Sequence, residues 1–152
     1  MLIDRFWKEM ESVHSAMLAV GDAPHVPMMP YARKEDRAIW FITAQGTALV
    51  DAITRGEGEA SLIVTGESNM HARIKAGATI VQDGAKLEEL WNPIASSWFD
   101  SIEDPDIRLI RLVPTEAEVW LTSGGLGFAF ELVKSKLTGK QPDAGEHFSL
   151  TF

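Results

Sequence analysis

The segment from His71 to Val81 constrains the fold most, because its residues alternate strictly between apolar and polar. One face carries only apolar side chains, those of Ala72, Ile74, Ala76, Ala78 and Ile80. The other face carries Arg73, Lys75 and Thr79. A period of two is that of a β-strand with one face on a core and the other in solvent, so the segment predicts a half-buried antiparallel strand. Gly77 marks a predicted bulge or a close backbone approach within it.

Other short apolar segments surround this strand at hairpin-length spacing. Strands are predicted at residues 16–20, 25–31, 38–43, 60–65, 107–113, 116–121 and 147–152. Pro27 and Pro30 place the segment 25–31 at a sheet edge or a bulge, because proline cannot donate to a strand ladder. Strands at this spacing predict a mainly β chain that closes, or nearly closes, into an antiparallel β-barrel and forms a single domain over residues 1–152.

Helices are predicted at the ends of this barrel rather than in regular alternation with the strands, which argues against a doubly wound parallel sheet. The first covers residues 4–13, where apolar side chains recur at helical spacing. Further helices are predicted at 47–54, after Asp83, from Asn92-Pro93 to Trp98, and at 128–137. Asp83 and Asn92 are the expected N-caps of the two middle helices.

Composition excludes several classes of function. The formal net charge is −8, which disfavours nucleic acids and anionic membranes, whereas it suits a protein that handles a small molecule. No apolar run is long enough to span a bilayer, and the first residues lack the pattern of a secretory signal. There is no cysteine, so disulfides and thiolate metal sites are excluded. We therefore expect a cytoplasmic protein.

Most patterns that might carry chemistry have a simpler interpretation. The four histidines show no metal-binding spacing, so we expect no metal site. The glycines at 124–127 match no complete phosphate-binding motif, and the acidic loop 100–106 lacks the glycine and glutamate of a calcium loop. Trp91 and Trp98 lie seven residues apart, which favours core packing on one helix face. The alternative is that they form a wall for a planar ring.

The segment from Ala38 to Val50 is the best candidate for a cofactor site. An apolar strand ends in a turn of small polar residues, and a short helix follows. Such a turn can hold a phosphorylated cofactor, but the segment contains no basic residue.

Several motifs resemble the pyridoxamine 5'-phosphate oxidase-like flavoproteins, specifically the bacterial general stress protein group. The motifs run in order along the chain: residues 87–93, 97–99, 104–106, 109–114, 117–120, 138–140, 142–143 and 145–147. The resemblance implies a six-stranded antiparallel split β-barrel of the FMN-binding type with flanking helices, and a homodimer with its cofactor sites at the subunit interface. An oxidase acting on pyridoxamine phosphate itself is disfavoured, because residues 121–125 read Leu-Thr-Ser-Gly-Gly instead of an Arg-x-His-Asp-Arg-like substrate motif.

The resemblance also implies the cofactor-binding positions. They are Val26, Pro27, Met28, Ile42, Thr43, Thr47, Leu49 and Trp120. Val26 stands where the family has a phosphate-binding arginine, and Leu49 stands where it has a lysine. Thr43 and Thr47 keep the hydroxyl groups that the resemblance implies for the site, and Trp120 keeps its aromatic ring.

The two aliphatic replacements leave two hypotheses open. Each lost charge-assisted hydrogen bond costs about 1.5–3 kcal/mol, so FMN binding would weaken by orders of magnitude unless another cation compensates. Arg33, Arg37, Arg55 and Arg73 are candidates for that cation. Under the first hypothesis the protein binds FMN and is a flavin-dependent oxidoreductase with an unknown substrate. Under the second it is a non-catalytic binding or stress module whose site accepts an uncharged ligand.

Overall fold

A computed structural model of the chain describes residues 1–65, 69–122, 133, 136–139 and 145–152. Its helices are α1 (Leu2–Met10), α2 (Ala48–Thr54), α3 (Gly84–Leu90) and α4 (Pro93–Trp98), with a 3₁₀ turn η1 at Lys34–Asp36. Its strands are β1 (Ala16–Val20), β2 (Ala23–Met28), β3 (Tyr31–Arg33), β4 (Ala38–Ala44), β5 (Glu59–Thr65), β6 (Met70–Val81), β7 (Ile107–Thr122) and β8 (Gly145–Thr151).

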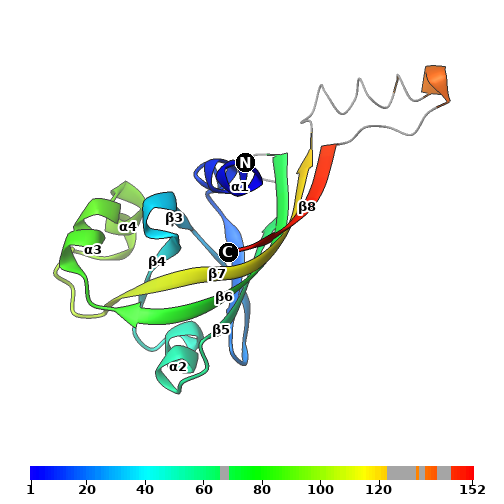
Figure 1. Ribbon diagram of the computed structural model, residues 1–152. Coiled ribbons are helices and arrows are strands. Elements are labelled where there is room, and N and C mark those ends of the chain that lie inside the picture. Colours follow the sequence, from blue (N-terminus) through cyan, green and yellow to red (C-terminus); the bar gives the residue numbers. More distant parts are fainter. Residues whose placement is uncertain (66–68, 123–132, 134–135, 140–144) are drawn as a thin grey trace.

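The strands form one antiparallel sheet with the order β2-β1-β5-β6-β7-β4-β3, and β8 pairs with β7 beside this path. Figure 1 shows the sheet curling, with α1 near one end, α2 beside β5 and β6, and the α3–α4 pair at the side of β3 and β4. The mainly β antiparallel prediction is confirmed. The described sheet has eight strands rather than six. The extended segment 25–31 divides into β2 and the start of β3, whereas the segments 107–113 and 116–121 form the single strand β7.

Strand β6 has the alternation that the sequence predicts. The side chains of Met70, Ala72, Ile74, Ala76 and Ala78 are buried, and those between them are exposed. The helix caps are also as predicted, since the Asp83 side chain accepts a hydrogen bond from the Lys86 amide. The first helix begins and ends earlier than predicted, at Leu2 and Met10. The predicted helix 128–137 lies largely outside the described residues.

Strand β7 corrects the prediction of two strands separated at Pro114. It is continuous over 16 residues, and its register against β6 shifts between Lys75 and Ala76. Lys75 faces Glu116 and Ala76 faces Pro114, so Thr115 is the extra residue. The bulge therefore lies beside Gly77 but is carried by the partner strand. A bulge tolerates a proline because one ladder hydrogen bond is missing there.

The core is divided between the two faces of β4. Ile39 and Phe41 point into the main cluster inside the curled sheet, where Phe6 and Met10 of α1 also pack. Trp40 and Ala38 point to the other face, where they pack with Leu90 and Leu109 beneath α3. β4 is thus buried on both faces, which explains its unbroken apolar sequence.

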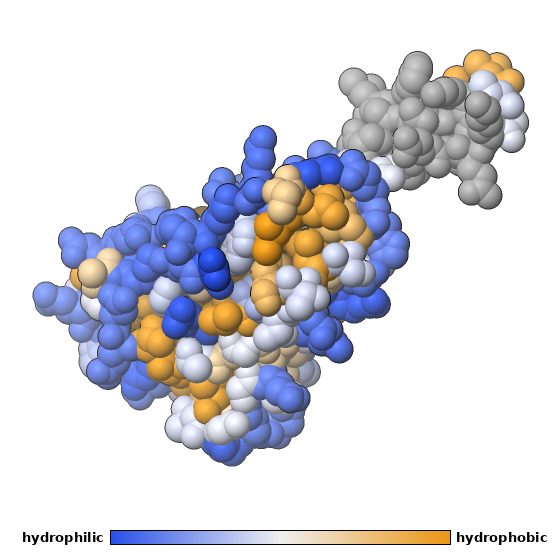
Figure 2. All heavy atoms as spheres, viewed as in Figure 1, coloured by the Kyte–Doolittle hydropathy of each residue, from blue (hydrophilic) through white to orange (hydrophobic). Residues whose placement is uncertain are grey.

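The surface is largely hydrophilic on the side drawn in Figure 2, with apolar residues gathered near α2 and where β8 crosses the long strands. None of the described helices has the length and hydrophobicity needed to cross a membrane.

Candidate functional site

A pocket of about 460 Å³ opens between the ends of β2 and β4 and helix α4. Its lining consists of His14, Ser15, Pro27, Met28, Met29, Tyr31, Ile42, Thr43, Ala44, Ile94, Ala95, Trp98 and Phe99. The volume lies within the ~300–1,000 Å³ range of ordinary small-molecule sites. No lysine, arginine, aspartate or glutamate occurs among these lining residues, so the wall is mainly apolar and aromatic.

Helix α4 supplies the most exposed wall of the pocket. Trp98 is 81% exposed and Ile94 is 51% exposed, although both are large apolar side chains. The prediction that Trp91 and Trp98 pack together in the core is therefore wrong. Trp91 ends α3 in an extended conformation and a new helix begins at Pro93, so the helical spacing is broken between the two rings. An exposed tryptophan beside an apolar pocket offers a planar surface for a ligand ring.

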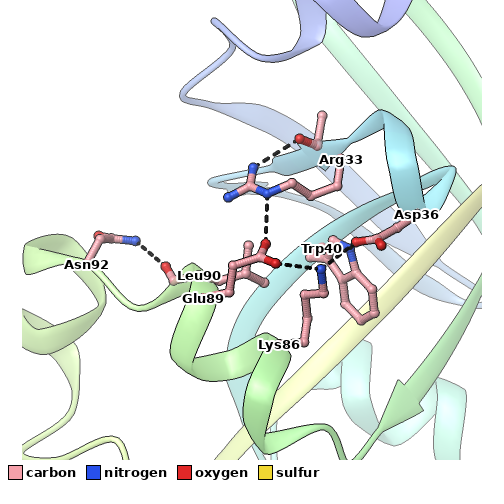
Figure 3. A network of polar contacts seen from close by, with 8 residues as sticks. Arg33, Asp36, Trp40, Lys86, Glu89, Leu90 and Asn92 are labelled. Carbon is pink, nitrogen blue, oxygen red and sulfur yellow. Dashed lines mark hydrogen bonds and ion pairs between the residues drawn. The ribbon is translucent and has the colours of Figure 1, made fainter.

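Helix α3 is attached to the β3–β4 hairpin by the network of polar contacts in Figure 3. The Lys86 Nζ atom lies 2.6 Å from Asp36 Oδ2 and 3.0 Å from Glu89 Oε1. Its ammonium group also lies over the Trp40 ring, 5.4 Å from the centroid. Trp40 Nε1 donates to the same Asp36 oxygen at 3.0 Å, and Arg33 Nε donates to Glu89 at 3.0 Å. The Lys86–Asp36 pair is 13% and 25% exposed, so water screens it less than the Arg33–Glu89 pair, whose side chains are 31% and 46% exposed.

The charges of this network shift one another's pKa. The hydrogen bond from Lys86 lowers the pKa of Asp36, and the Trp40 donor lowers it further. The Asp36 acceptor raises the pKa of Lys86. Hydrogen bonds from Lys86 and Arg33 lower the pKa of Glu89. Asp36, Lys86 and Glu89 are therefore charged at neutral pH, and their contacts fix the place of α3.

Asn92 connects α3 to α4 and α4 to the pocket. Its Oδ1 accepts from the amides of Ile94 at 2.8 Å and Ala95 at 3.2 Å, which caps α4 as the sequence predicts. Its Nδ2 donates to the Tyr31 hydroxyl at 2.7 Å. Tyr31 lines the pocket from β3. The Asn92 side chain thus sets the position of α4, which carries Trp98, relative to β3, which carries Tyr31.

Four of the eight predicted site residues lie together in this pocket. Pro27 and Met28 come from β2, and Ile42 and Thr43 from β4. Sequence reasoning missed Met29 and Tyr31, although they directly continue the Pro27-Met28 segment. It also missed the part of the wall that Phe99 and Ile94 form, although the motif 97–99 and the alternative of a ring-binding wall at Trp98 both pointed to this segment.

The other four predicted residues do not line the pocket. Val26 faces Leu18 on β1 and is 37% exposed. Thr47 caps α2, where its Oγ1 donates to the Ala44 carbonyl at 3.1 Å and accepts from the Val50 amide. Leu49 is only 3% exposed and belongs to the main core.

Trp120 lies in a different cluster, on the part of β7 that pairs with β8. Its ring stacks on His147 with 4.9 Å between centroids and 3° between planes, and the Arg73 guanidinium lies 5.5 Å from its centroid. His147 and Ser149 also hydrogen-bond to Glu118. The histidine contact is the main reason that the pKa of Glu118 is lowered.

The four arginines predicted as substitute cations do not line the pocket either. Arg33 pairs with Glu89, and Arg55 pairs with Asp22 and Glu57. Arg73 lies at Trp120, and Arg37 occupies a left-handed turn after η1. In the part of the chain that the structure describes, no group of three or more histidine or acidic residues could hold a metal ion.

Comparison with solved structures finds the same fold in the general stress proteins. A protein assigned as general stress protein 26 from Jannaschia sp. CCS1 is 35% identical, with a TM-score of 0.91 over 99% of this chain and 98% of that one. The general stress FMN/FAD binding protein of Xanthomonas citri is 27% identical, with a TM-score of 0.68 over 80% of this chain and 89% of that one. General stress protein 26 of Bacillus anthracis, at 17% identity and a TM-score of 0.67 over 78% and 92% of the two chains, shares the fold.

No curated relative matches the chain in sequence. The family described as pyridoxamine 5'-phosphate oxidase like matches residues 2–143, which is nearly the whole chain. The split-barrel prediction is confirmed by the Jannaschia structure. This protein belongs to the pyridoxamine 5'-phosphate oxidase-like family, and its structural neighbours are general stress proteins.

Proposed function

We propose that this protein is a flavin-binding split-barrel protein of the general stress group, with the flavin ring in the pocket between β2, β4 and α4. The observation that carries the proposal is the meeting of Pro27, Met28, Ile42 and Thr43 in one apolar pocket. The name of the Xanthomonas citri relative supports it, because that protein is described as FMN/FAD binding.

The residues of the pocket fit the ring of a flavin better than its phosphate. Aromatic and thioether side chains provide an apolar surface, with Trp98 free to cover a planar group. The Thr43 hydroxyl is a polar contact within that surface. The family positions for phosphate are unsuitable, since Val26 carries no charge and Leu49 is buried in the core. A bound flavin would supply electron or hydride transfer, and the protein would hold and orient it.

The proposal extends to the domain organisation, the cellular compartment, the oligomeric state and the class of substrate. The chain forms a single split-barrel domain over residues 1–152, works in the cytoplasm, and assembles as a homodimer with the flavin at the interface. The substrate, if the protein is an oxidoreductase, is a small molecule. Trp120 would then belong to the site through the partner subunit.

The second candidate function is a non-catalytic module that binds an uncharged ligand in the same pocket. The buried Leu49 favours it, because a solvent-facing cation cannot occupy that place without disturbing the core. The two functions differ in one measurable property, which is the affinity of the protein for a flavin.

A flavin titration tests the proposal. The visible spectrum of the purified protein is recorded, and the apoprotein is titrated with FMN while flavin fluorescence is followed. We expect saturable binding that weakens in the Thr43→Val variant and is unchanged in Thr79→Val. Thr79 provides a matched control, since it lies exposed on β6 and does not line the pocket. A colourless protein that leaves added FMN unbound would refute the proposal and favour the uncharged-ligand module.

A further inference from the structure

We propose that Arg108 is the residue that binds the flavin phosphate, in place of the cations missing at Val26 and Leu49. The inference rests on the proposed function, and it assigns a residue outside every position that the family resemblance implied. Arg108 lies on β7, and its register partner on β4 is Thr43, which lines the pocket. Directly paired residues of an antiparallel sheet point to the same face. Arg108 and Thr43 therefore share one face of the sheet, and Arg108, which does not itself line the pocket, lies one strand away from the lining residue Thr43.

The guanidinium of Arg108 is fixed against the turn that follows β4. Its Nη2 donates to Gln45 Oε1 at 2.9 Å, and its Nη1 donates to the carbonyls of Pro105 at 2.8 Å and Ile107 at 2.9 Å. Gln45 is held in turn, because its Nε2 donates to Asp106 Oδ1 at 2.5 Å and its backbone amide donates to the Asp106 carbonyl at 2.8 Å. A fixed guanidinium loses little conformational freedom when it binds an anion.

The charge of Arg108 is not neutralised by a direct ion pair in the described part of the chain. Arg5, Arg33 and Arg55 each pair with a carboxylate there, whereas the acceptors of Arg108 are two carbonyls and one amide. Asp106 is the nearest acid in this hydrogen-bond chain, and the Gln45 amide stands between the two. Arginine remains charged at any ordinary pH.

The donors of Arg108 are also incompletely used. An arginine side chain has five N–H groups, and the three hydrogen bonds above engage three of them. The two others, one on Nε and one on Nη2, donate to none of the described protein groups. Paired N–H donors of a guanidinium match phosphate oxygens well. Of the described basic side chains, Arg108 is the one hydrogen-bonded to the segment from Thr43 to Thr47.

A comparison of FMN with riboflavin tests this assignment, because the two share the ring and differ in the phosphate. Dissociation constants of both are measured for the wild type, Arg108→Met and Arg108→Lys, with thermal unfolding to establish that each variant is folded. We expect the wild type to prefer FMN. Arg108→Met should lower FMN affinity by about tenfold or more and leave riboflavin affinity unchanged. Arg108→Lys should retain part of the preference, since the charge persists without the planar fork.

Arg111→Met is the matched control, because it removes the same charge from an exposed position on the same strand. It should leave the ratio of FMN to riboflavin affinity unchanged. Rising salt should weaken FMN binding to the wild type more than riboflavin binding. Equal affinity of the wild type for the two flavins, or an unchanged preference in Arg108→Met, would overturn the assignment of Arg108 while the proposed function stands. If the wild type binds neither flavin, the proposed function fails and the assignment fails with it.

Discussion

Replacing Leu49 with lysine, the residue that the family resemblance implies for this position, should destabilise the protein substantially. Leu49 is 3% exposed and packs in the main core with Ala52 and the strands. Full burial of a leucine contributes about 1.5–3 kcal/mol, and an ammonium group cannot remain in that environment without a partner. The lysine can recover part of the loss if its alkyl stem stays buried while its charge reaches water. We therefore expect the free energy of unfolding to fall by about 2–4 kcal/mol.

Urea unfolding followed by tryptophan fluorescence measures this change. For a chain of this length, the same loss corresponds to a melting temperature lower by about 5–15 °C. Leu49→Met is the control, because it keeps the volume and should cost less than about 1.5 kcal/mol. Val26→Arg should change stability by no more than about 0.5 kcal/mol, since Val26 is 37% exposed on an edge strand. If Leu49→Lys is as stable as the wild type, position 49 can reach solvent, and the argument that the core excludes a cation there is refuted.

Three further predictions concern the α3 network, the exposed ring of Trp98 and the turn at Gly21. Asp36→Asn should make the stability of the protein less sensitive to acid. Because the pKa of Asp36 is lowered in the folded state, its contribution to the free energy of unfolding is present above about pH 4 and is lost as the pH falls through the folded pKa. The urea midpoint of the wild type should therefore fall more steeply with acid than that of the variant. Trp98→Ala should weaken flavin binding in a fluorescence titration with little change in melting temperature, because the ring is 81% exposed; a large loss of stability would contradict its placement. Gly21→Ala should lower the free energy of unfolding in urea by at least about 1–2 kcal/mol, because Gly21 has φ +56° and a Cβ would lie 2.7 Å from that of Glu57; an unchanged urea midpoint would contradict that strain.

Local sequence signals predicted the elements that depend on near neighbours. The alternation in β6 reflects a strand with one face on the core, and that face is buried as expected. The caps at Asp83 and Asn92 need only a side-chain oxygen and amides two or three residues later. The strand β1 is likewise where its apolar segment placed it.

Elements that depend on the partner strand were not predictable in the same way. Pro114 and Thr115 were interpreted as the junction between two strands, 107–113 and 116–121. The partner of Pro114 across the sheet, Ala76, adjoins the register shift that leaves Thr115 as an extra residue, and the strand continues through it. The prediction of core packing for Trp98 failed for a different reason. A helix of six residues shows too few turns for its apolar side chains to reveal which face is covered.

The candidate site combines these two cases. Pro27, Met28, Ile42 and Thr43 could be named beforehand because the family resemblance fixes them along the chain, and the fold brings them into one pocket. Arg108 could not be named, since it lies 65 positions after Thr43 in the sequence and only the β4–β7 register makes them neighbours. The absence of the two cations that the resemblance implies at positions 26 and 49 does not by itself exclude a ligand with a phosphate. The sheet can present a positive charge from another strand, and an account of binding in this family must therefore examine every residue that the register places beside the pocket.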